Sequence, residues 1–224
     1  MPQSSARKNM ALSQLMTNEI HDARLLAALD AVPREDFVPQ ALKGAAYVDD
    51  ELPLGNGRFL MAPLPFARLL ALAEIQPEDR VLDVGCAFGY STAVLAHLAG
   101  SVVACESDAA MMSTAQRELS TFSTVRLVQA ALTLGAPAHA PYDVILLEGA
   151  ISAPPEALLA QLADGGRLVA VERRAGDKAA PGVPGGLGQV VVYTHLNGQI
   201  MRKTGAGANV PLLPGFERPA GFVF

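Results

Sequence analysis

Cysteine, basic charge and long hydrophobic runs are all scarce in this chain. Its two cysteines, Cys86 and Cys105, are too few for a disulfide framework, and each is expected to be a reduced, buried thiol. Acidic residues outnumber basic ones by 22 to 17. The chain therefore lacks the excess of positive charge with which a protein binds the phosphate backbone of nucleic acid. No hydrophobic run reaches the roughly 18 residues of a membrane span, because Arg68, Glu74 and His97 interrupt the apolar stretches. We therefore expect no nucleic-acid partner and no membrane partner.

A metal-ligand pattern and a secretory signal are also missing. The four histidines are scattered without the spacing of metal ligands, so no metal site is expected. The first ten residues, MPQSSARKNM, lack the apolar stretch of a signal peptide, and a cytoplasmic enzyme is the default expectation. The chain does have 224 residues that are 50% hydrophobic, which is enough to bury the core of a single globular domain over residues 1–224.

Short aliphatic runs alternate with helix-like segments through the middle of the chain. Near-continuous apolar strands that are separated by helices indicate a parallel sheet covered on both faces. The pattern therefore predicts a doubly wound α/β fold with a Rossmann-like, mostly parallel sheet. Strands are expected at residues 80–84, 102–106, 125–129, 143–147 and 167–171, and helices at 91–99, 108–119 and 155–163.

The region before the first strand has weaker signals. Leucines and other apolar residues at helical spacing predict one amphipathic helix over residues 10–31. Residues 45–58 have turn chemistry and little periodicity. A second helix is expected to begin after Pro63 or Pro65 and to run to about residue 75, because proline is favoured in the first turn of a helix.

The region after the sheet combines a loop with a hairpin. Half of residues 175–188 are glycine or proline, which predicts a flexible loop; whether it closes over a site is left open. Residues 189–196 and 199–203 are strand-like, and Asn197-Gly198 between them is a strong hairpin signal. The sheet is therefore expected to end in antiparallel strands.

Residues 81–90, VLDVGCAFGY, are the most informative segment of the chain. They predict a strand that ends near Asp83, a turn that contains Gly85 and Gly89, and then a helix. The glycine spacing is tighter than the G-x-G-x-x-G of dinucleotide folds and favours S-adenosylmethionine, whose methionine end needs partners for a carboxylate and an ammonium group. Glu106 closes the next expected strand, where an acid can accept hydrogen bonds from both hydroxyls of a ribose.

Three flanking segments add a resemblance to a known family. They are VPREDFVP at residues 32–39, AYVDDELPLGNG at 46–57 and PEALLAQLADGGRLV at 155–169. With the glycine-rich turn, they make the chain similar to the protein-L-isoaspartate O-methyltransferases over nearly its whole length. The resemblance implies S-adenosylmethionine as the cofactor, S-adenosylhomocysteine as its product and a damaged protein or peptide as the substrate. In that substrate the free α-carboxylate of an L-isoaspartyl residue takes the methyl group, and the ester then collapses to a succinimide.

The resemblance also divides the chain and implies a set of site residues. Residues 1–79 would hold the N-terminal helices and the substrate loop, 80–171 the cofactor-binding core, and 172–224 the glycine- and proline-rich loop with the C-terminal strands. The oligomeric state is left open. Asp83 and the following turn would hold the methionine end of the cofactor, and Glu106 the ribose. The implied cofactor residues are Asp83, Gly85, Cys86, Ala87, Gly89, Tyr90, Glu106, Ser107, Ala131 and Leu132.

The expected substrate loop departs from the family pattern. The family has a hydroxyl-rich loop of the form Gln-Thr-Ile-Ser, and this chain has Arg58, Phe59, Leu60 and Met61. Met61 thus stands where the substrate-binding hydroxyl is expected, and one hydrogen bond to a charged group is worth roughly 1.5–3 kcal/mol. Arg58 is a candidate to grip the substrate carboxylate instead, and its alternative is a solvated loop arginine. Phe59, Leu60 and Met61 belong either to the core or to the wall of an apolar substrate pocket.

Two further positions leave the function open. Ala131 stands where the family has an acid that accepts from the adenine amino group, a loss of about 1 kcal/mol, while Leu132 can still pack on the adenine. Glu148 follows the fourth expected strand, and it can accept from a substrate amine, act as a base or point to solvent. The hypotheses are isoaspartyl methylation helped by Arg58, methylation of another nucleophile with Glu148 as base, and a binding module without catalysis.

Overall fold

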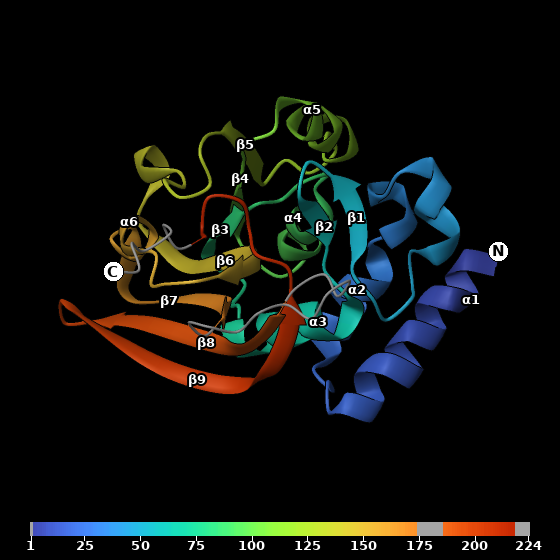
Figure 1. Ribbon diagram of the computed structural model, residues 1–224, viewed down its shortest axis with the longest axis horizontal. Coiled ribbons are helices and arrows are strands. Elements are labelled where there is room, and N and C mark those ends of the chain that lie inside the picture. The colour runs from blue at the N-terminus through green and yellow to red at the C-terminus, as the bar shows by residue number, and fades with distance from the viewer. Residues whose placement is uncertain (1, 174–185, 218–224) are drawn as a thin grey trace, which may run out of the picture.

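A seven-stranded sheet forms the centre of the protein (Figure 1). The computed structural model describes residues 2–173 and 186–217. The strand order is β5-β4-β3-β6-β7-β8-β9, with the first five strands parallel and the last two antiparallel, which confirms the predicted fold. The strands are β3 (Arg80–Val84), β4 (Ser101–Glu106), β5 (Val125–Gln129), β6 (Tyr142–Ile151), β7 (Leu162–Arg173), β8 (Gly186–Leu196) and β9 (Gln199–Val210).

Side chains alternate between two cores on opposite faces of the sheet. In β3, Val81 packs into one core and Leu82 into the other, and Leu146 and Leu147 of β6 divide in the same way. Because helices or other segments cover both faces, the central strands have few positions that face water. This is why they appear in the sequence as near-continuous apolar runs.

The predicted single helix over residues 10–31 is wrong. Glu19 adopts a left-handed backbone conformation with a φ of 66°, and the Asp22 carboxylate accepts hydrogen bonds from the first N–H groups of the next helix. A left-handed residue ends one helix and an N-cap begins another, although the apolar spacing runs through both. The resulting elements are α1 (Pro2–Asn9), the π-helical η1 (Met10–Leu15), the 3-10 helix η2 (Met16–Asn18) and α2 (Ala23–Ala31).

The other predicted helices are present, although one of them is much shorter than expected. The helix predicted over residues 155–163 has only four residues, because β7 already begins at Leu162. None of the helices in the described ranges is long and apolar enough to cross a membrane. The helices are α3 (Pro63–Ala73), α4 (Tyr90–Ala96), α5 (Ala109–Glu118) and α6 (Glu156–Leu159), with the 3-10 helices η3 (Arg34–Phe37), η4 (Gln40–Ala45) and η5 (Pro137–His139).

A small hairpin lies where the sequence predicted only turns. β1 (Leu52–Gly55) pairs antiparallel with β2 (Arg58–Leu60), and the two residues between them, Asn56 and Gly57, have positive φ angles. Positive φ at both turn positions suits the twist of a tight hairpin. The hairpin brings the start of β2 to the end of β4, because Arg58 bonds to Glu106 there.

The C-terminal hairpin is confirmed, and a further segment follows it. β8 and β9 pair antiparallel about Asn197-Gly198. The loop predicted at residues 175–188 is wrong for residues 186–188, which begin β8 because they pair with β9, and its other residues lie outside the described ones. Residues 211–217, here called the C-terminal segment, run back beside β6 (Figure 1). The Ala150 N–H donates to the Pro211 carbonyl at 2.8 Å, and the Leu213 N–H donates to the Ala150 carbonyl at 2.8 Å. This segment therefore covers the carboxyl end of β6.

Replacing Leu146 by alanine should destabilise the protein strongly. Leu146 is fully buried in β6, the central strand of the sheet, so its truncation leaves a cavity and costs about 2–5 kcal/mol of unfolding free energy. Leu134 is 58% exposed, and Leu134→Ala is the control that should change stability by less than about 0.5 kcal/mol. Urea denaturation measures both variants, and equal stability of the two would contradict this packing.

Candidate functional site

The candidate site lies at the edge of the sheet where the parallel strands end. β3 leads into a turn in which Gly85 and Gly89 have φ angles of 89° and 99°, and α4 follows directly. The Gly85 N–H donates to the Cys105 carbonyl at 2.8 Å, which holds the turn against β4. Glu106 ends β4, and Glu148 lies near the end of β6. The predicted strand, turn and helix are therefore present, with two acids on the neighbouring strands.

The Glu106 carboxylate is fully buried and fully hydrogen-bonded. Arg58 Nη1 donates to its Oε1 at 2.9 Å and to its Oε2 at 2.7 Å. Oε1 also accepts from the backbone N–H groups of Ser107 at 2.7 Å and Asp108 at 3.0 Å, and Oε2 accepts from the Ala87 N–H at 2.8 Å. Buried carboxylates need such donors and a counter-ion, so Glu106 is compensated within the chain.

Arg58 lies on the glycine turn itself. Its side chain is only 3% exposed, and Nη2 donates to the Gly85 carbonyl. A Cβ atom added to Gly85 would be 2.6 Å from Arg58 Nη2 and 3.0 Å from Leu213 Cδ1. The guanidinium and Leu213 therefore cover the turn. The alternative of a solvated loop arginine is wrong, because burial of Glu106 supplies a stronger partner than water does.

Asp83 has one satisfied oxygen and one free oxygen. Its Oδ2 accepts from Ser91 Oγ at 2.7 Å and Thr92 Oγ1 at 2.6 Å. Its Oδ1 is buried and has no hydrogen-bond partner within the described residues. Burial raises the pKa of Asp83 to about 6, against the lowering effects of the Thr92 and Ser91 hydrogen bonds and of Arg58. A buried acceptor without a donor is a place for a cationic ligand group.

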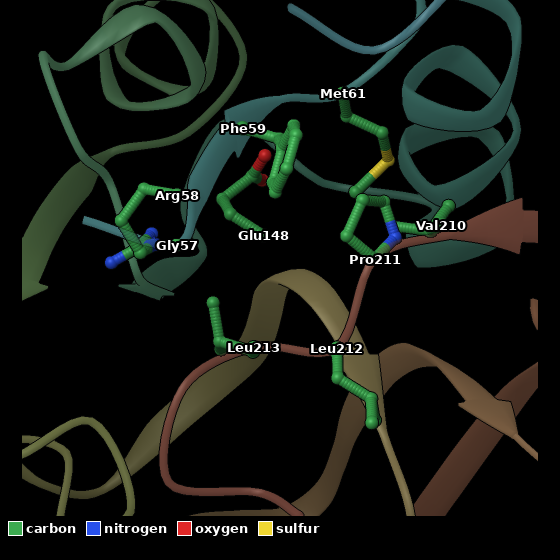
Figure 2. Close-up of a pocket in the computed structure, with 9 residues that line it drawn as sticks. All are labelled: Gly57, Arg58, Phe59, Met61, Glu148, Val210, Pro211, Leu212 and Leu213. Carbon is green, nitrogen blue, oxygen red and sulfur yellow. The ribbon is translucent and has the colours of Figure 1, made fainter. Parts of the chain in front are cut away.

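Glu148 is turned into a small cavity instead of towards solvent. Figure 2 shows its side chain beside the Phe59 ring, and its Oε1 is buried without a hydrogen-bond partner in the described part of the chain. Burial raises the pKa of Glu148 well above its usual value, the charge of Asp83 raises it further, and Arg58 lowers it. The cavity has a volume of about 10 Å³, which is room for about one water molecule. Its lining residues are Gly57, Arg58, Phe59, Met61, Glu148, Val210, Pro211, Leu212 and Leu213.

Arg34 is a buried cation that the sequence reasoning did not single out. It is 1% exposed, and its Nε donates to the Ala46 carbonyl at 2.6 Å and its Nη2 to the Met61 carbonyl. Its Cζ lies 5.0 Å from the centre of the Tyr90 ring, which also packs against Phe37. Arg34 thus links the segment at residues 32–39 to Ala46, to Met61 and to Tyr90 at the start of α4.

Comparison with known proteins decides the family. A family model described as Protein-L-isoaspartate(D-aspartate) O-methyltransferase matches residues 6–178. A protein-L-isoaspartate O-methyltransferase of Methylorubrum extorquens is 44% identical over 167 residues, which cover 74% of this chain and 73% of the relative. A protein-L-isoaspartate O-methyltransferase of Methanoregula boonei is 39% identical over 170 residues, which cover 75% of this chain and 78% of the relative. The chain belongs to the protein-L-isoaspartate O-methyltransferase family.

Solved structures of the family share the fold. One protein-L-isoaspartate O-methyltransferase superposes with a TM-score of 0.77 at 20% identity, over 93% of this chain and 66% of that chain, so this protein spans just under two thirds of it. A Plasmodium falciparum protein of the same description superposes with a TM-score of 0.73 at 17% identity, over 94% of this chain and 97% of that chain. That structure was solved in complex with S-adenosyl-L-homocysteine. The methyltransferase fold implied by the sequence resemblance is confirmed.

The residues that replace the family hydroxyl loop divide between core and cavity. Leu60 and Met61 are both buried in the hydrophobic core. Phe59 and Met61 also line the small cavity beside Glu148 (Figure 2). The core expectation is therefore confirmed for Leu60 and Met61, and a role of this segment as the wall of a substrate pocket stays a prediction.

The residues expected near the adenine and the turn differ in exposure. Ala131 is exposed, and Leu132 is buried in the core on the α6 face of the sheet. Cys86 and Ala87 are buried in the turn, and burial raises the pKa of the Cys86 thiol. Ser107 is exposed and donates to Glu106 Oε1 through its backbone N–H at 2.7 Å and its Oγ at 3.3 Å. Their roles in binding a cofactor stay predictions.

The residues at the turn fit S-adenosylmethionine, the cofactor of this family, on one condition. The Gly85 turn, the buried acid Glu106 and the free Oδ1 of Asp83 offer what a ribose and an ammonium group require. Arg58 and Leu213, however, cover the same turn. The fit therefore depends on movement of Arg58 away from Glu106 and of the Leu213 side chain away from Gly85. Within residues 2–173 and 186–217 no group of three or more potential metal ligands is found.

The pH dependence of stability should report the protonation of Asp83. Because burial raises the pKa of Asp83 from 3.8 to about 6, the folded protein keeps this proton where the unfolded chain has lost it. The stabilisation is complete below about pH 4 and is lost as the pH rises through about 6. Asp83→Asn cannot ionise, so it should gain stability relative to the wild type between pH 4 and 7 in urea denaturation. Parallel pH profiles would show that the pKa of Asp83 is not raised.

Proposed function

We propose that this protein transfers a methyl group from S-adenosylmethionine to the free α-carboxylate of L-isoaspartyl residues in damaged proteins. The observation that carries the proposal is membership of the family, since the family model matches residues 6–178 and curated relatives of that name are 39–44% identical. The proposal includes a protein or peptide as the substrate and the cytoplasmic location expected from the sequence.

Three groups of the chain would hold the cofactor. The carboxylate of Glu106 is suited to the two ribose hydroxyls, because it is buried and lies at the end of β4 beside the turn. The buried Oδ1 of Asp83 is suited to the ammonium group, and it accepts best when Asp83 is ionised. Gly85 has no Cβ atom, so a ligand could approach its backbone closely once Arg58 had moved away. When bound, S-adenosylmethionine supplies a methyl group on a positively charged sulfur.

The chain contributes position and exclusion of water instead of a base. A carboxylate is already ionised at neutral pH, so no residue needs to remove a proton from it. The β1–β2 hairpin and the C-terminal segment cover the edge of the sheet and exclude water around the reacting groups. Burial raises the pKa of Glu148, which favours its protonated form and so reduces its repulsion of a substrate carboxylate.

Methyl transfer to an isoaspartyl peptide is the direct test. With S-adenosylmethionine that carries a labelled methyl group, the protein should label a peptide containing one L-isoaspartyl residue. The same peptide with L-aspartate at that position should stay unlabelled. The label should be released as methanol by mild alkali, because the product is an ester. Equal labelling of both peptides, or a label that resists alkali, would contradict carboxyl methylation and indicate another nucleophile.

Met61→Ser should raise kcat/KM for the isoaspartyl peptide about tenfold. The change returns a hydroxyl to the wall of the cavity, and one hydrogen bond to a charged group corresponds to about tenfold or more. Leu60→Ser is the matched control, because it also removes a buried apolar side chain but does not line the cavity. No gain in a folded Met61→Ser protein would show that the substrate carboxylate does not reach this position.

A further inference from the structure

Glu106 has no acceptor site to spare while Arg58 is in place. A carboxylate offers about four lone-pair positions, and its two oxygens here accept from Arg58 and from the N–H groups of Ala87, Ser107 and Asp108. Release of Arg58 leaves Oε2 with the Ala87 N–H alone and so frees an acceptor position for a ribose hydroxyl. The three backbone donors belong to the fixed turn after β3 and the end of β4, so the Arg58 side chain is the partner that can give way.

Arg58 also fills the space that a ligand on the turn requires. Its Nη2 lies 2.6 Å from the position that a Cβ on Gly85 would take, and Leu213 Cδ1 lies 3.0 Å from it, so an atom placed there requires Arg58 to move. The guanidinium and a cofactor bound on Gly85 therefore exclude each other. A cofactor that takes Glu106 must release Arg58.

A released Arg58 remains beside the cavity and lacks an anion. Arg58 lines the cavity together with Phe59 and Met61. These residues belong to the segment that would contact the substrate in the proposed function. A guanidinium in an apolar surrounding is costly without a counter-ion. Glu148 is the carboxyl group that lines the same cavity, and burial raises its pKa while Arg58 is paired with Glu106. A substrate carboxylate would supply the missing charge.

We propose that Arg58 exchanges partners during the reaction: it pairs with Glu106 in the free protein and with the substrate carboxylate after the cofactor has taken Glu106. This inference rests on the proposed function and assigns a substrate-binding residue where the family pattern has glutamine. Binding is then ordered, with the cofactor before the substrate. A free carboxylate is selected because a guanidinium can grip it through two hydrogen bonds.

Calorimetric titration with S-adenosylhomocysteine tests the first half of the exchange without turnover. Arg58→Gln no longer has to break an ion pair, so it should bind S-adenosylhomocysteine about tenfold more tightly than the wild type, because the binding-competent state is no longer a minor one. Arg167→Gln is the matched control. It removes another partly buried ion pair, with Asp79, at the amino-terminal end of the strands, and its Kd should equal that of the wild type.

Steady-state kinetics with the isoaspartyl peptide test the second half. At saturating S-adenosylmethionine, Arg58→Gln should raise KM for the peptide about tenfold or more and leave kcat nearly unchanged, because the lost contact binds the substrate before and during transfer alike. Arg58→Lys keeps the positive charge but cannot hold a carboxylate through two parallel hydrogen bonds. Its KM for the peptide should therefore lie between the values of the wild type and of Arg58→Gln. Opposite shifts of the cofactor Kd and the peptide KM are not expected from a purely structural arginine.

The outcomes separate this proposal from the proposed function. Melting followed by circular dichroism shows whether each variant folds, and Arg58→Lys supports the same comparisons with smaller shifts if Arg58→Gln does not fold. An unchanged Kd for S-adenosylhomocysteine in a folded variant would overturn the exchange, as would a tighter Kd with an unchanged peptide KM. Absence of binding in wild type and variants alike would overturn the proposed function itself.

Discussion

The buried ion pair between Arg58 and Glu106 is the interaction on which the arrangement of the site depends. Glu106 is inaccessible to water at the end of β4, so its charge must be compensated by the chain or by a ligand. In the protein alone Arg58 provides that charge, and it brings the β1–β2 hairpin onto the glycine turn. Together with Leu213, the guanidinium held by this pairing covers the turn.

The same edge of the sheet concentrates further charges that the chain does not fully compensate. Asp83 Oδ1, Glu148 Oε1 and Arg34 Nη1 are all buried without a hydrogen-bond partner in the described residues. Unsatisfied buried polar atoms are unfavourable in a protein that only has to fold, and they are typical of places where a ligand completes the network. Their position around the turn and the cavity agrees with a two-part site for a cofactor and an anionic substrate.

Local signals made most of the fold predictable, and distant contacts made the rest unpredictable. The runs that became β3 and β5 have the expected bounds, because apolar strands and glycine turns are local features. The return of residues 211–217 beside β6 depends on tertiary contacts, whereas the break at Glu19 and the β1–β2 hairpin have local signals, the Asp22 N-cap and Asn56-Gly57, that the periodicity analysis did not use. Glu106 and Arg58 were both identified from the sequence, but their pairing across 48 residues was not, because nothing local specifies which buried acid a loop arginine will meet.

A crystal structure of the protein with bound S-adenosylhomocysteine is the most direct test of the exchange at Glu106. We expect Glu106 to accept hydrogen bonds from the ribose, and the Arg58 guanidinium to have left the Gly85 carbonyl and to face the cavity lined by Phe59 and Met61. S-adenosylhomocysteine bound while Arg58 still pairs with Glu106 would contradict it.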